Sequence, residues 1–467
     1  MISSSLHPEP VRAACVPRGR FAFGLTQRAI WLLSAGLLFA LPGFFHASWG
    51  LGMIEWDSLV LLAIILDGLR LPAAQRITIE RSWSNAPALD SETEIQLAVE
   101  HSAKTILECN LTDDLPDALV AEPATRNLRV FPRVRATLRY KFEPRERGDV
   151  RAGAVYIRYG SALGLVERWA MAPLEQPVRV YPALRQGEDQ EIFLACGRQV
   201  EMQLRRARER GLGRDFESLR EYLQGDDLRD VCWTATARRG QLVTRRYQTE
   251  RSQAVWIVLD AGRLLRGRIL NDPDVPDRRG HSKLDYACST AVALAQLALF
   301  SGDRVGLLVY GQQVQQRVLP GRGHAHLRQI VEALAQARAE LSEADHLRAT
   351  AVLNRWQPRR ALILWITDLA ETAMRPEVID GAMQLLRRHV LLFVAMAQPD
   401  VAAIANTRPR NVEEMFRASA AQELTTRREL LLARLRDQGA LTLDLDPPLL
   451  TSAVLNQYLR VKERAMV

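Results

Sequence analysis

The stretch AVWIVLD, residues 254–260, decides how the second half of this 467-residue chain folds. It is a short apolar run that ends in one acidic residue, which is typical of a strand buried on both faces of a parallel sheet. Comparable apolar runs recur at 304–310, 361–368, 390–395 and 440–445, and helical patterns separate them. Strands that alternate with helices predict a doubly wound α/β domain, which we place at residues 253–467.

Two of these predicted strands end in a carboxylate, Asp260 and Asp368. Ligands of open α/β sheets bind at the carboxyl ends of the strands, and hard cations prefer carboxylate oxygens. Asp260 and Asp368 are therefore a candidate divalent-metal pair. The alternative is that Asp260 caps backbone groups or pairs with Arg263 beside Asp368.

The segment that precedes the first strand, residues 216–251, is too rich in large apolar side chains to be a plain linker. Its acidic and basic residues nearly balance, whereas a nucleic-acid surface would be basic. Asp226 or Asp227 is placed to cap a helix, and Gly240 to end it in a left-handed conformation. A strand is expected at 241–247.

An ordered set of motifs in this segment carries a family resemblance: FESLREY (216–222), GDDLRD (225–230), Trp233, AR (237–238) and RRYQTER (245–251). With these motifs the chain resembles the bacterial family catalogued as domain of unknown function 58. The resemblance extends from about residue 70 to the C-terminus. It implies that residues 253–467 form a von Willebrand factor A-like domain, and that a MoxR-type AAA+ ATPase is the partner.

Residues 184–252 are predicted to form a linker helix followed by the charged signature. The charged side chains proposed to dock a partner are Arg220, Asp226, Asp227, Arg229, Arg238 and Arg246. The alternative is that their ion pairs only fix local packing, since exposed pairs contribute about 0–1 kcal/mol each.

A-type domains hold a metal with an Asp-x-Ser-x-Ser motif, a threonine on a later loop and a further aspartate. The first motif reads DAGRL here, residues 260–264, so both serines are absent and Arg263 adds a positive charge. Asp368 matches the later aspartate, and Thr350 is the stand-in for the threonine. The resemblance thus implies a degenerate site, and Mg²⁺ is the one cofactor it leaves open.

Residues 72–183 follow a different pattern, with apolar and polar side chains alternating at 76–83, 94–99, 136–142 and 150–159. Half-buried strands at such intervals predict a β-sandwich-like domain. No chemical constellation stands out in it, so we interpret it as a structural or interaction module.

The N-terminal region contains two apolar runs, an uncharged one at 29–45 and a shorter one at 59–69 that includes Asp67. Together they predict a hairpin of two transmembrane helices at 29–71, behind a cytoplasmic tail at 1–28. A signal peptide is the competing interpretation of the first run. The arginines on both sides place both ends in the cytoplasm, with the bulk of the chain on the inner face of the bacterial cell membrane. These arginines are Arg12, Arg18, Arg20 and Arg28 before the hairpin, and Arg70, Arg76 and Arg81 after it. If the second run only lies on the membrane, the topology reverses.

The composition, 48% hydrophobic and 25% charged, is that of an ordinary globular protein. Five scattered cysteines form no CxxC pair, which argues against a zinc knuckle or a disulfide framework. No GxSxG or HExxH motif and no complete phosphate loop occurs. We therefore expect no enzyme. The leading hypothesis is a membrane-anchored interaction or scaffold protein that works with the ATPase in protein assembly or maturation. The alternatives are a divalent-metal-dependent hydrolase using Asp260 and Asp368, and an extracytoplasmic adhesion protein.

Overall fold

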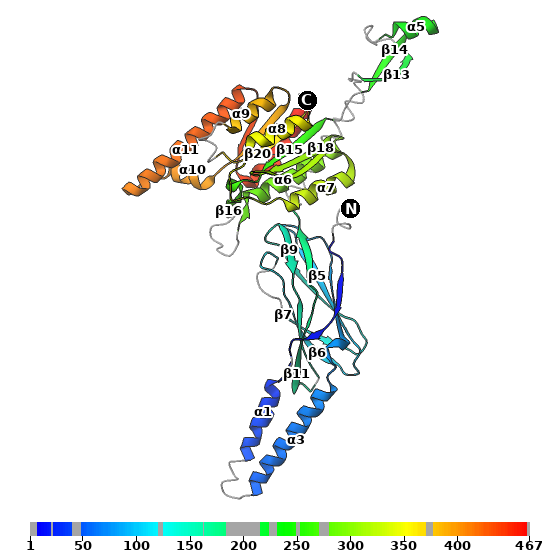
Figure 1. Ribbon diagram of the computed structural model, residues 1–467, viewed down its shortest axis with the longest axis vertical. Coiled ribbons are helices and arrows are strands. Elements are labelled where there is room, and N and C mark those ends of the chain that lie inside the picture. The colour runs from blue at the N-terminus through cyan, green and yellow to red at the C-terminus, as the bar shows by residue number, and fades with distance from the viewer. Residues whose placement is uncertain are drawn as a thin grey trace. The chain divides into compact units, whose positions relative to one another are not determined.

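The computed structural model describes residues 7–19, 22–39, 48–119, 125–161, 163–183, 215–223, 231–248, 253–269, 280–369 and 377–464 (Figure 1). The chain divides into two compact units, residues 1–181 and 182–467. Each unit is described by itself below.

The first unit consists mainly of antiparallel strands. Its strands are β1 (Val11–Ala14), β2 (Val16–Pro17), β3 (Phe23–Leu25), β4 (Ile77–Trp83), β5 (Thr93–His101), β6 (Leu107–Asp113), β7 (Thr125–Val130), β8 (Ala136–Phe142), β9 (Gly148–Ala152), β10 (Val155–Ser161), β11 (Val166–Ala172) and β12 (Gln176–Val180). One sheet has the order β1-β4-β5-β8, and the second has β2-β11-β10-β6-β7 with β3 also paired to β11. β9 and β12 form a further pair.

A single apolar core holds the two larger sheets together. Ile79 of β4 and Leu97 of β5 come from one sheet, and Leu111 of β6 and Ile157 of β10 come from the other. All four side chains are buried. Because successive side chains of a strand point to opposite faces, the period-two pattern of these strands buries every second residue between the sheets.

One buried ion pair crosses this sandwich. Arg81 of β4 donates to the Asp113 carboxylate of β6, and its guanidinium also donates to the carbonyl oxygens of Gly153 (2.9 Å) and Leu174 (3.0 Å). The Tyr140 hydroxyl donates to the same carboxylate. Burial raises the pKa of Asp113, and the charge of Arg81 opposes that rise. Arg81 therefore occupies a core position of β4, where its charge is paired inside the fold.

The predicted transmembrane hairpin is contradicted by the structure of the same segment. α1 (Gln27–Gly36) has only 10 residues and continues as a short 3₁₀ turn, η2 (Leu37–Phe39). α3 (Ser48–Arg70) has 23 residues but includes Glu55, Asp57 and Asp67. In the described part of the chain, no helix combines the length and the apolar character that a membrane crossing requires.

The contacts of α3 also explain Asp67, the acidic residue for which the predicted hairpin gave no partner. Asp67 is fully buried and accepts hydrogen bonds from the Ser161 hydroxyl and from the backbone N–H groups of Leu165 and Val166. It therefore joins the end of α3 to the turn between β10 and β11. Residues within 11–25 of the expected tail form paired strands, because β1 pairs with β4, and β2 and β3 pair with β11.

The second unit contains a six-stranded sheet with the order β19-β18-β15-β20-β21-β22. Its strands are β15 (Ala254–Asp260), β18 (Arg304–Tyr310), β19 (Val314–Gly321), β20 (Leu362–Thr367), β21 (Val390–Met396) and β22 (Leu441–Leu445). All neighbouring strands are parallel except β18 and β19, which are antiparallel. The alternating pattern of the sequence therefore does produce a mainly parallel sheet.

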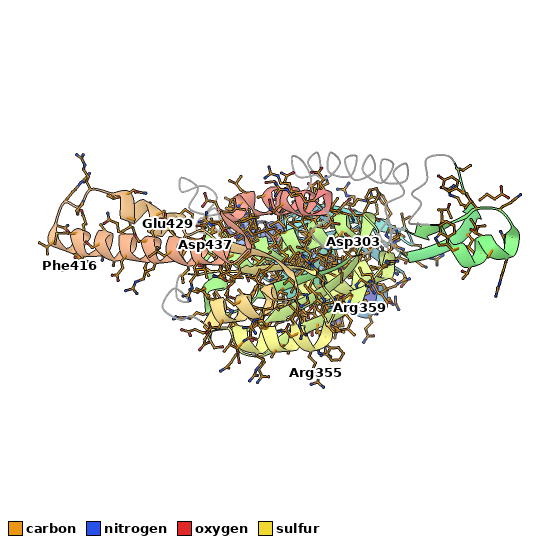
Figure 2. The ribbon with its side chains drawn as sticks, turned by 90° about the horizontal axis from the view of Figure 1, so that it is seen from above. Asp303, Arg355, Arg359, Phe416, Glu429 and Asp437 are labelled. Atoms are coloured by element: carbon orange, nitrogen blue, oxygen red, sulfur yellow. The ribbon has the colours of Figure 1, made fainter. Side chains whose placement is uncertain are left out.

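Helices connect these strands. They are α6 (Lys283–Phe300), α7 (Gly323–Gln336), α8 (His346–Trp356), α9 (Glu377–Leu386), α10 (Pro399–Asn406), α11 (Val412–Asp437) and α12 (Leu450–Glu463). Trp256 and Trp365 of the sheet share a core with residues of α8, α9 and α11. α6 packs against β15 and β18 and also contacts α12, while none of its residues belongs to that core. Figure 2 shows α11 running from Phe416 near its start to Asp437 at its end.

The signature segment ahead of this sheet forms a small unit of local structure. β13 (Asp215–Glu221) and β14 (Val243–Gln248) pair antiparallel, and α5 (Trp233–Arg239) lies between them in the sequence. Gly240 ends α5 with φ of 66°, as its left-handed position predicted. No residue of α5 is buried, whereas Val231 and Cys232, which directly precede it, are buried.

Candidate functional site

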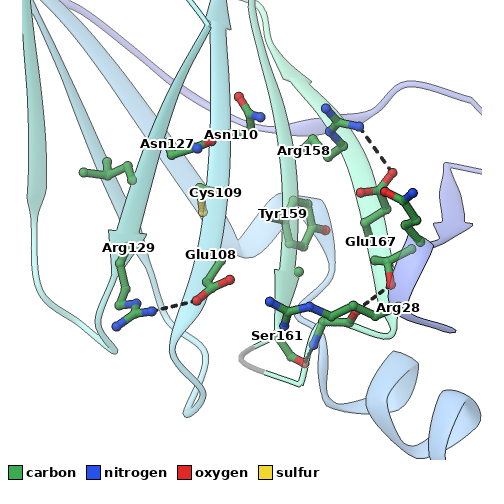
Figure 3. A pocket seen from close by; sticks show the side chains of 15 residues that line it. Arg28, Glu108, Cys109, Asn110, Asn127, Arg129, Arg158, Tyr159, Ser161 and Glu167 are labelled. Carbon is green, nitrogen blue, oxygen red and sulfur yellow. Dashed lines mark hydrogen bonds and ion pairs between the residues drawn. The ribbon is translucent and has the colours of Figure 1, made fainter. Parts of the chain in front are cut away.

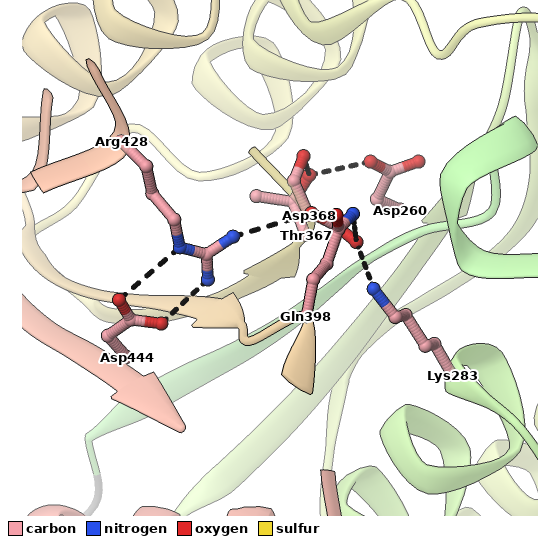
Figure 4. Close-up of polar contacts among 7 residues, drawn as sticks. All are labelled: Asp260, Lys283, Thr367, Asp368, Gln398, Arg428 and Asp444. Carbon is pink, nitrogen blue, oxygen red and sulfur yellow. Dashed lines mark hydrogen bonds and ion pairs between the residues drawn. The ribbon is translucent and has the colours of Figure 1, made fainter. Parts of the chain in front are cut away.

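The site is the carboxyl edge of the second unit's sheet, where β15 and β20 end side by side (Figure 4). Asp260 is the last residue of β15, and Asp368 follows the last residue of β20. Both side chains are buried. The structure thus brings together the two carboxylates that the sequence singled out, because adjacent parallel strands end at the same edge of a sheet.

A lysine ammonium lies against the second of these carboxylates. Lys283 is the first residue of α6, and its Nζ is 2.5 Å from Asp368 Oδ2. Ser282 and Asp285 form a capping box that fixes where α6 begins, and this start places Lys283 at the edge of the sheet. The Lys283 side chain is only 7% exposed, so the pair is well shielded from water.

The remaining contacts of Asp368 come from the last part of the chain. Gln398 Nε2 donates to its Oδ2 at 3.1 Å, and Arg428 Nη1 lies 3.5 Å from its Oδ1. Arg428 also holds Asp444 in a two-point contact, at 2.7 Å and 3.3 Å. The network therefore links α6, β20, α11 and β22 (Figure 4).

Asp260 has different neighbours. Its Oδ2 accepts from the Thr367 hydroxyl at 2.6 Å, and its Oδ1 accepts from the Gly262 backbone N–H at 2.7 Å. Burial raises the pKa of Asp260, while the nearby His346 and these two hydrogen bonds oppose the rise. The interpretation of Asp260 as a cap of backbone groups is thus confirmed for Gly262.

Gly262 itself is required by this arrangement. A Cβ atom at this position would lie 2.9 Å from the Ala344 backbone nitrogen and 3.1 Å from Asp260 Oδ1. Any side chain would therefore force the loop after β15 away from Asp260, and the hydrogen bond from the Gly262 N–H would be lost.

A buried aromatic cluster lies next to Asp260. Tyr310, the last residue of β18, accepts from Trp365 Nε1 at 2.7 Å and lies 2.9 Å from His346 Nδ1. Burial lowers the pKa of His346 and raises that of Tyr310. Burial thus favours the uncharged form of both side chains.

Thr350 was the expected stand-in for the threonine of an A-type metal site, and that expectation was wrong. Thr350 lies inside α8, and its hydroxyl donates to the His346 carbonyl oxygen of the same helix at 2.9 Å. Thr367, which the sequence did not single out, is the threonine that contacts Asp260.

As arranged, the donor set does not fit a divalent cation. Hard cations such as Ca²⁺ and Mg²⁺ typically take six or more oxygen ligands. Here the Lys283 ammonium already contacts one of the two carboxylate oxygens of Asp368. Among the described residues, no group of three or more His, Cys, Asp or Glu side chains is placed to hold a metal. The edge is therefore a network of buried charges in which Lys283 provides the cation.

The residues expected to dock a partner fall in or near the β13–β14 hairpin. Arg238 is exposed on the last turn of α5, and Arg220 is half-buried on β13. Arg246 lies on β14, where the structure describes the backbone. Asp226, Asp227 and Arg229 lie outside the described residues. The sequence emphasised charge, yet the largest exposed side chain of α5 is Trp233, at 65%.

Comparison with known proteins finds a family match over part of the chain. Residues 218–415 match the family described as "Protein of unknown function DUF58", so the resemblance is confirmed over that region. An uncharacterised Bacillus subtilis (strain 168) protein, YeaD, is 23% identical over 288 residues, which cover 58% of this chain and 65% of the relative. An uncharacterised Mycobacterium tuberculosis (strain H37Rv) protein is 27% identical over 195 residues, covering 40% and 56%.

Both matches span less than two thirds of the relative's own length. Among solved structures, a conserved hypothetical protein, BatB from Bacteroides thetaiotaomicron, aligns over 46% of this chain and all of its own. The alignment has 16% identity and a TM-score of 0.30.

Proposed function

We propose that this protein is an interaction protein rather than an enzyme. Its signature hairpin, which consists of β13, β14 and α5 between them, docks a MoxR-type AAA+ ATPase during protein assembly or maturation. The observation that carries the proposal is α5, a helix of seven residues with none buried. It lies inside the region that matches the family.

The exposed side chains of α5 and of the turn that follows it define the chemistry of the partner. Trp233 and Leu242 are 65% and 42% exposed, and Arg238 and Arg239 are exposed in the last turn of α5. Tryptophan and arginine are the side chains that most often dominate binding energy in protein interfaces. This combination fits a partner surface with an apolar pocket and acidic residues beside it.

The larger domain supports an A-type assignment for residues 253–467. Its parallel sheet has one antiparallel edge strand, β19. An acidic residue ends the central strand β15, and another follows the central strand β20. In this proposal the A-type domain is degenerate, because the Lys283 ammonium contacts the Asp368 oxygen that a metal ion would need as a ligand.

The same contact weighs against a divalent-metal-dependent hydrolase. Such an enzyme would have to break the buried pair between Lys283 and Asp368 before Asp260 and Asp368 could share a cation. The adhesion alternative requires the topology in which only the first apolar run spans the membrane, whereas the described helix in that run, α1, has only 10 residues.

The test is affinity purification of the full chain from cells that also express the MoxR-type ATPase of the same genome. Recovery of the ATPase with the native chain, and its loss with the double variant Trp233→Ala/Arg238→Glu, supports the proposal. Equal recovery with both chains contradicts docking through α5, and no recovery with either contradicts the ATPase partnership.

A further inference from the structure

A hollow of about 710 Å³ lies on the first unit, over the sheet β11-β10-β6-β7 (Figure 3). This volume is in the range of small-ligand pockets, about 300–1,000 Å³. Neither the signature hairpin nor the carboxyl edge of the second unit's sheet contributes to its lining.

The register of the strands explains why the sheet is hollowed at this point. Arg129, Glu108, Gly160 and Glu167 lie opposite one another on four successive strands, so they occupy one row on one face. Gly160 is the only member of this row without a side chain. A Cβ atom there would meet a single atom within 4 Å, the Val166 carbonyl oxygen at 3.2 Å. Gly160 is therefore the floor of the hollow.

The next row on the same face supplies polar groups. Asn127, Asn110 and Arg158 lie opposite one another, two residues along their strands from the first row. Two ion pairs neutralise most of the charge: Arg129 with Glu108 at 2.8 Å, and Arg158 with Glu167 at 3.6 Å. Figure 3 shows both pairs on the walls of the hollow.

One cation remains after these pairs are formed. The lining contains three arginines and two glutamates, and no ion pair is found for Arg28 within the described parts of the chain. Arg28 extends from α1 past Gly164, where a Cβ atom would lie 3.2 Å from its Nη1. The Thr26 hydroxyl donates to the Gly164 carbonyl oxygen and so fixes the start of α1 beside the hollow.

One acceptor is also unused. Asn110 Oδ1 is buried and has no hydrogen-bond partner among the described residues. A buried acceptor without a partner costs free energy, and a ligand N–H group would remove that cost. The hollow therefore offers a guanidinium for an anion and an amide oxygen for a donor.

We propose that this hollow binds the C-terminal carboxylate of a peptide, with the carboxylate on Arg28 and a peptide N–H on Asn110 Oδ1. A peptide C-terminus carries both groups within one residue, and an arginine is well suited to hold a carboxylate. The mixed charges of the walls disfavour a ligand with several negative charges, because Glu108 and Glu167 would repel it.

The test is titration calorimetry of the full chain with three probes: N-acetyl-Ala-Ser-Ala with a free carboxylate, the same peptide with a C-terminal amide, and inorganic phosphate. The free acid is expected to bind, and the amide to bind about tenfold more weakly, because it lacks the charge-assisted contact with Arg28. Arg28→Gln is expected to weaken the acid by about the same factor and to leave the amide unchanged.

Two further variants keep the test specific. Gly160→Val fills the floor of the hollow and should abolish peptide binding; its melting temperature shows whether the unit is still folded. Arg139→Gln, at an exposed position of β8 in the same unit, is the matched control and should bind like the native chain. Absence of acid binding, equal binding of acid and amide, binding of phosphate alone, or indifference to Arg28→Gln would each overturn the proposal.

Discussion

Lys283 Nζ lies 2.5 Å from Asp368 Oδ2, at the edge of the sheet where the sequence had suggested a divalent cation. The lysine provides a positive charge on a helix whose start is fixed by its capping box. Because this positive charge belongs to a side chain and not to a bound metal ion, a chelator cannot remove it. The buried network at this edge is therefore part of the fold of the domain.

Removing the Lys283 ammonium should allow the carboxylates of Asp260 and Asp368 to bind a cation. Loss of one partner from a buried ion pair costs about 3–5 kcal/mol, and Arg428 and Gln398 still contact Asp368. We expect Lys283→Ala to lose about 3 kcal/mol of unfolding free energy and to regain part of it when Mg²⁺ is added. Thermal unfolding with and without Mg²⁺ measures both effects.

Lys462→Ala is the matched control for this experiment. Lys462 Nζ lies 2.9 Å from the buried carboxylate of Asp303, in the same unit but on α12. Its removal should also lower the melting temperature, with no recovery in Mg²⁺. A rise in the melting temperature of the native chain in Mg²⁺ would contradict our account of Lys283.

Asp260 should make stability fall as the pH rises. Its folded-state pKa is raised by burial above the usual 3.8, so the folded chain binds this proton more tightly than the unfolded chain. The stabilisation is present below the unfolded value and is lost as the pH rises through the folded one. In Asp260→Asn the amide retains an acceptor for Gly262, and the side chain carries no charge.

We therefore expect Asp260→Asn to gain melting temperature relative to the native chain as the pH rises from about 4 to about 7. Thermal unfolding of both proteins across this range measures the difference. A constant difference at every pH would show that the carboxyl group does not titrate as its burial predicts.

The sandwich of the first unit should depend on Arg81. Arg81→Met would leave Asp113 buried with the Tyr140 hydroxyl as its remaining side-chain donor, at a cost of about 3–5 kcal/mol. Hydrogen exchange of the β4 and β6 amides, followed by mass spectrometry, reports the loss in this unit alone. The double variant Arg81→Met/Asp113→Leu should recover much of the protection, since no unpaired charge is left. Equal exchange in all three proteins would contradict a structural role for the pair.

Several elements were predictable because their signals are local. The buried strands around Val258 and Leu364 are continuous apolar runs, and Gly240 ends α5 as expected. β19 was not predicted, because its glutamines and Pro320 interrupt any apolar pattern on this edge strand. Asp67 shows most clearly what local signals cannot predict. In the sequence it was an acidic residue that would be costly in a membrane-spanning helix, whereas in the structure it bonds Ser161, which lies 94 residues away.

The candidate site was predictable only in part, for the same reason. The strand ends identified Asp260 and Asp368, since sheet geometry brings them together. Lys283 and Arg428 are 85 and 60 residues from Asp368, and no periodicity in the sequence links them to it. Their contacts exist only after α6 and α11 have packed on the sheet.

Binding to the MoxR-type ATPase is the central claim, and one titration tests it most directly. The labelled ATPase is titrated with the native chain, with Trp233→Ala/Arg238→Glu, and with Arg355→Glu, a control at an exposed position on α8 (Figure 2). Loss of an aromatic anchor and reversal of one charge should each cost about 2 kcal/mol or more, so we predict at least a hundredfold weaker binding for the double variant. Its melting temperature should be unchanged, and the Arg355→Glu control should bind normally. Undiminished affinity of the double variant would contradict docking through the signature hairpin.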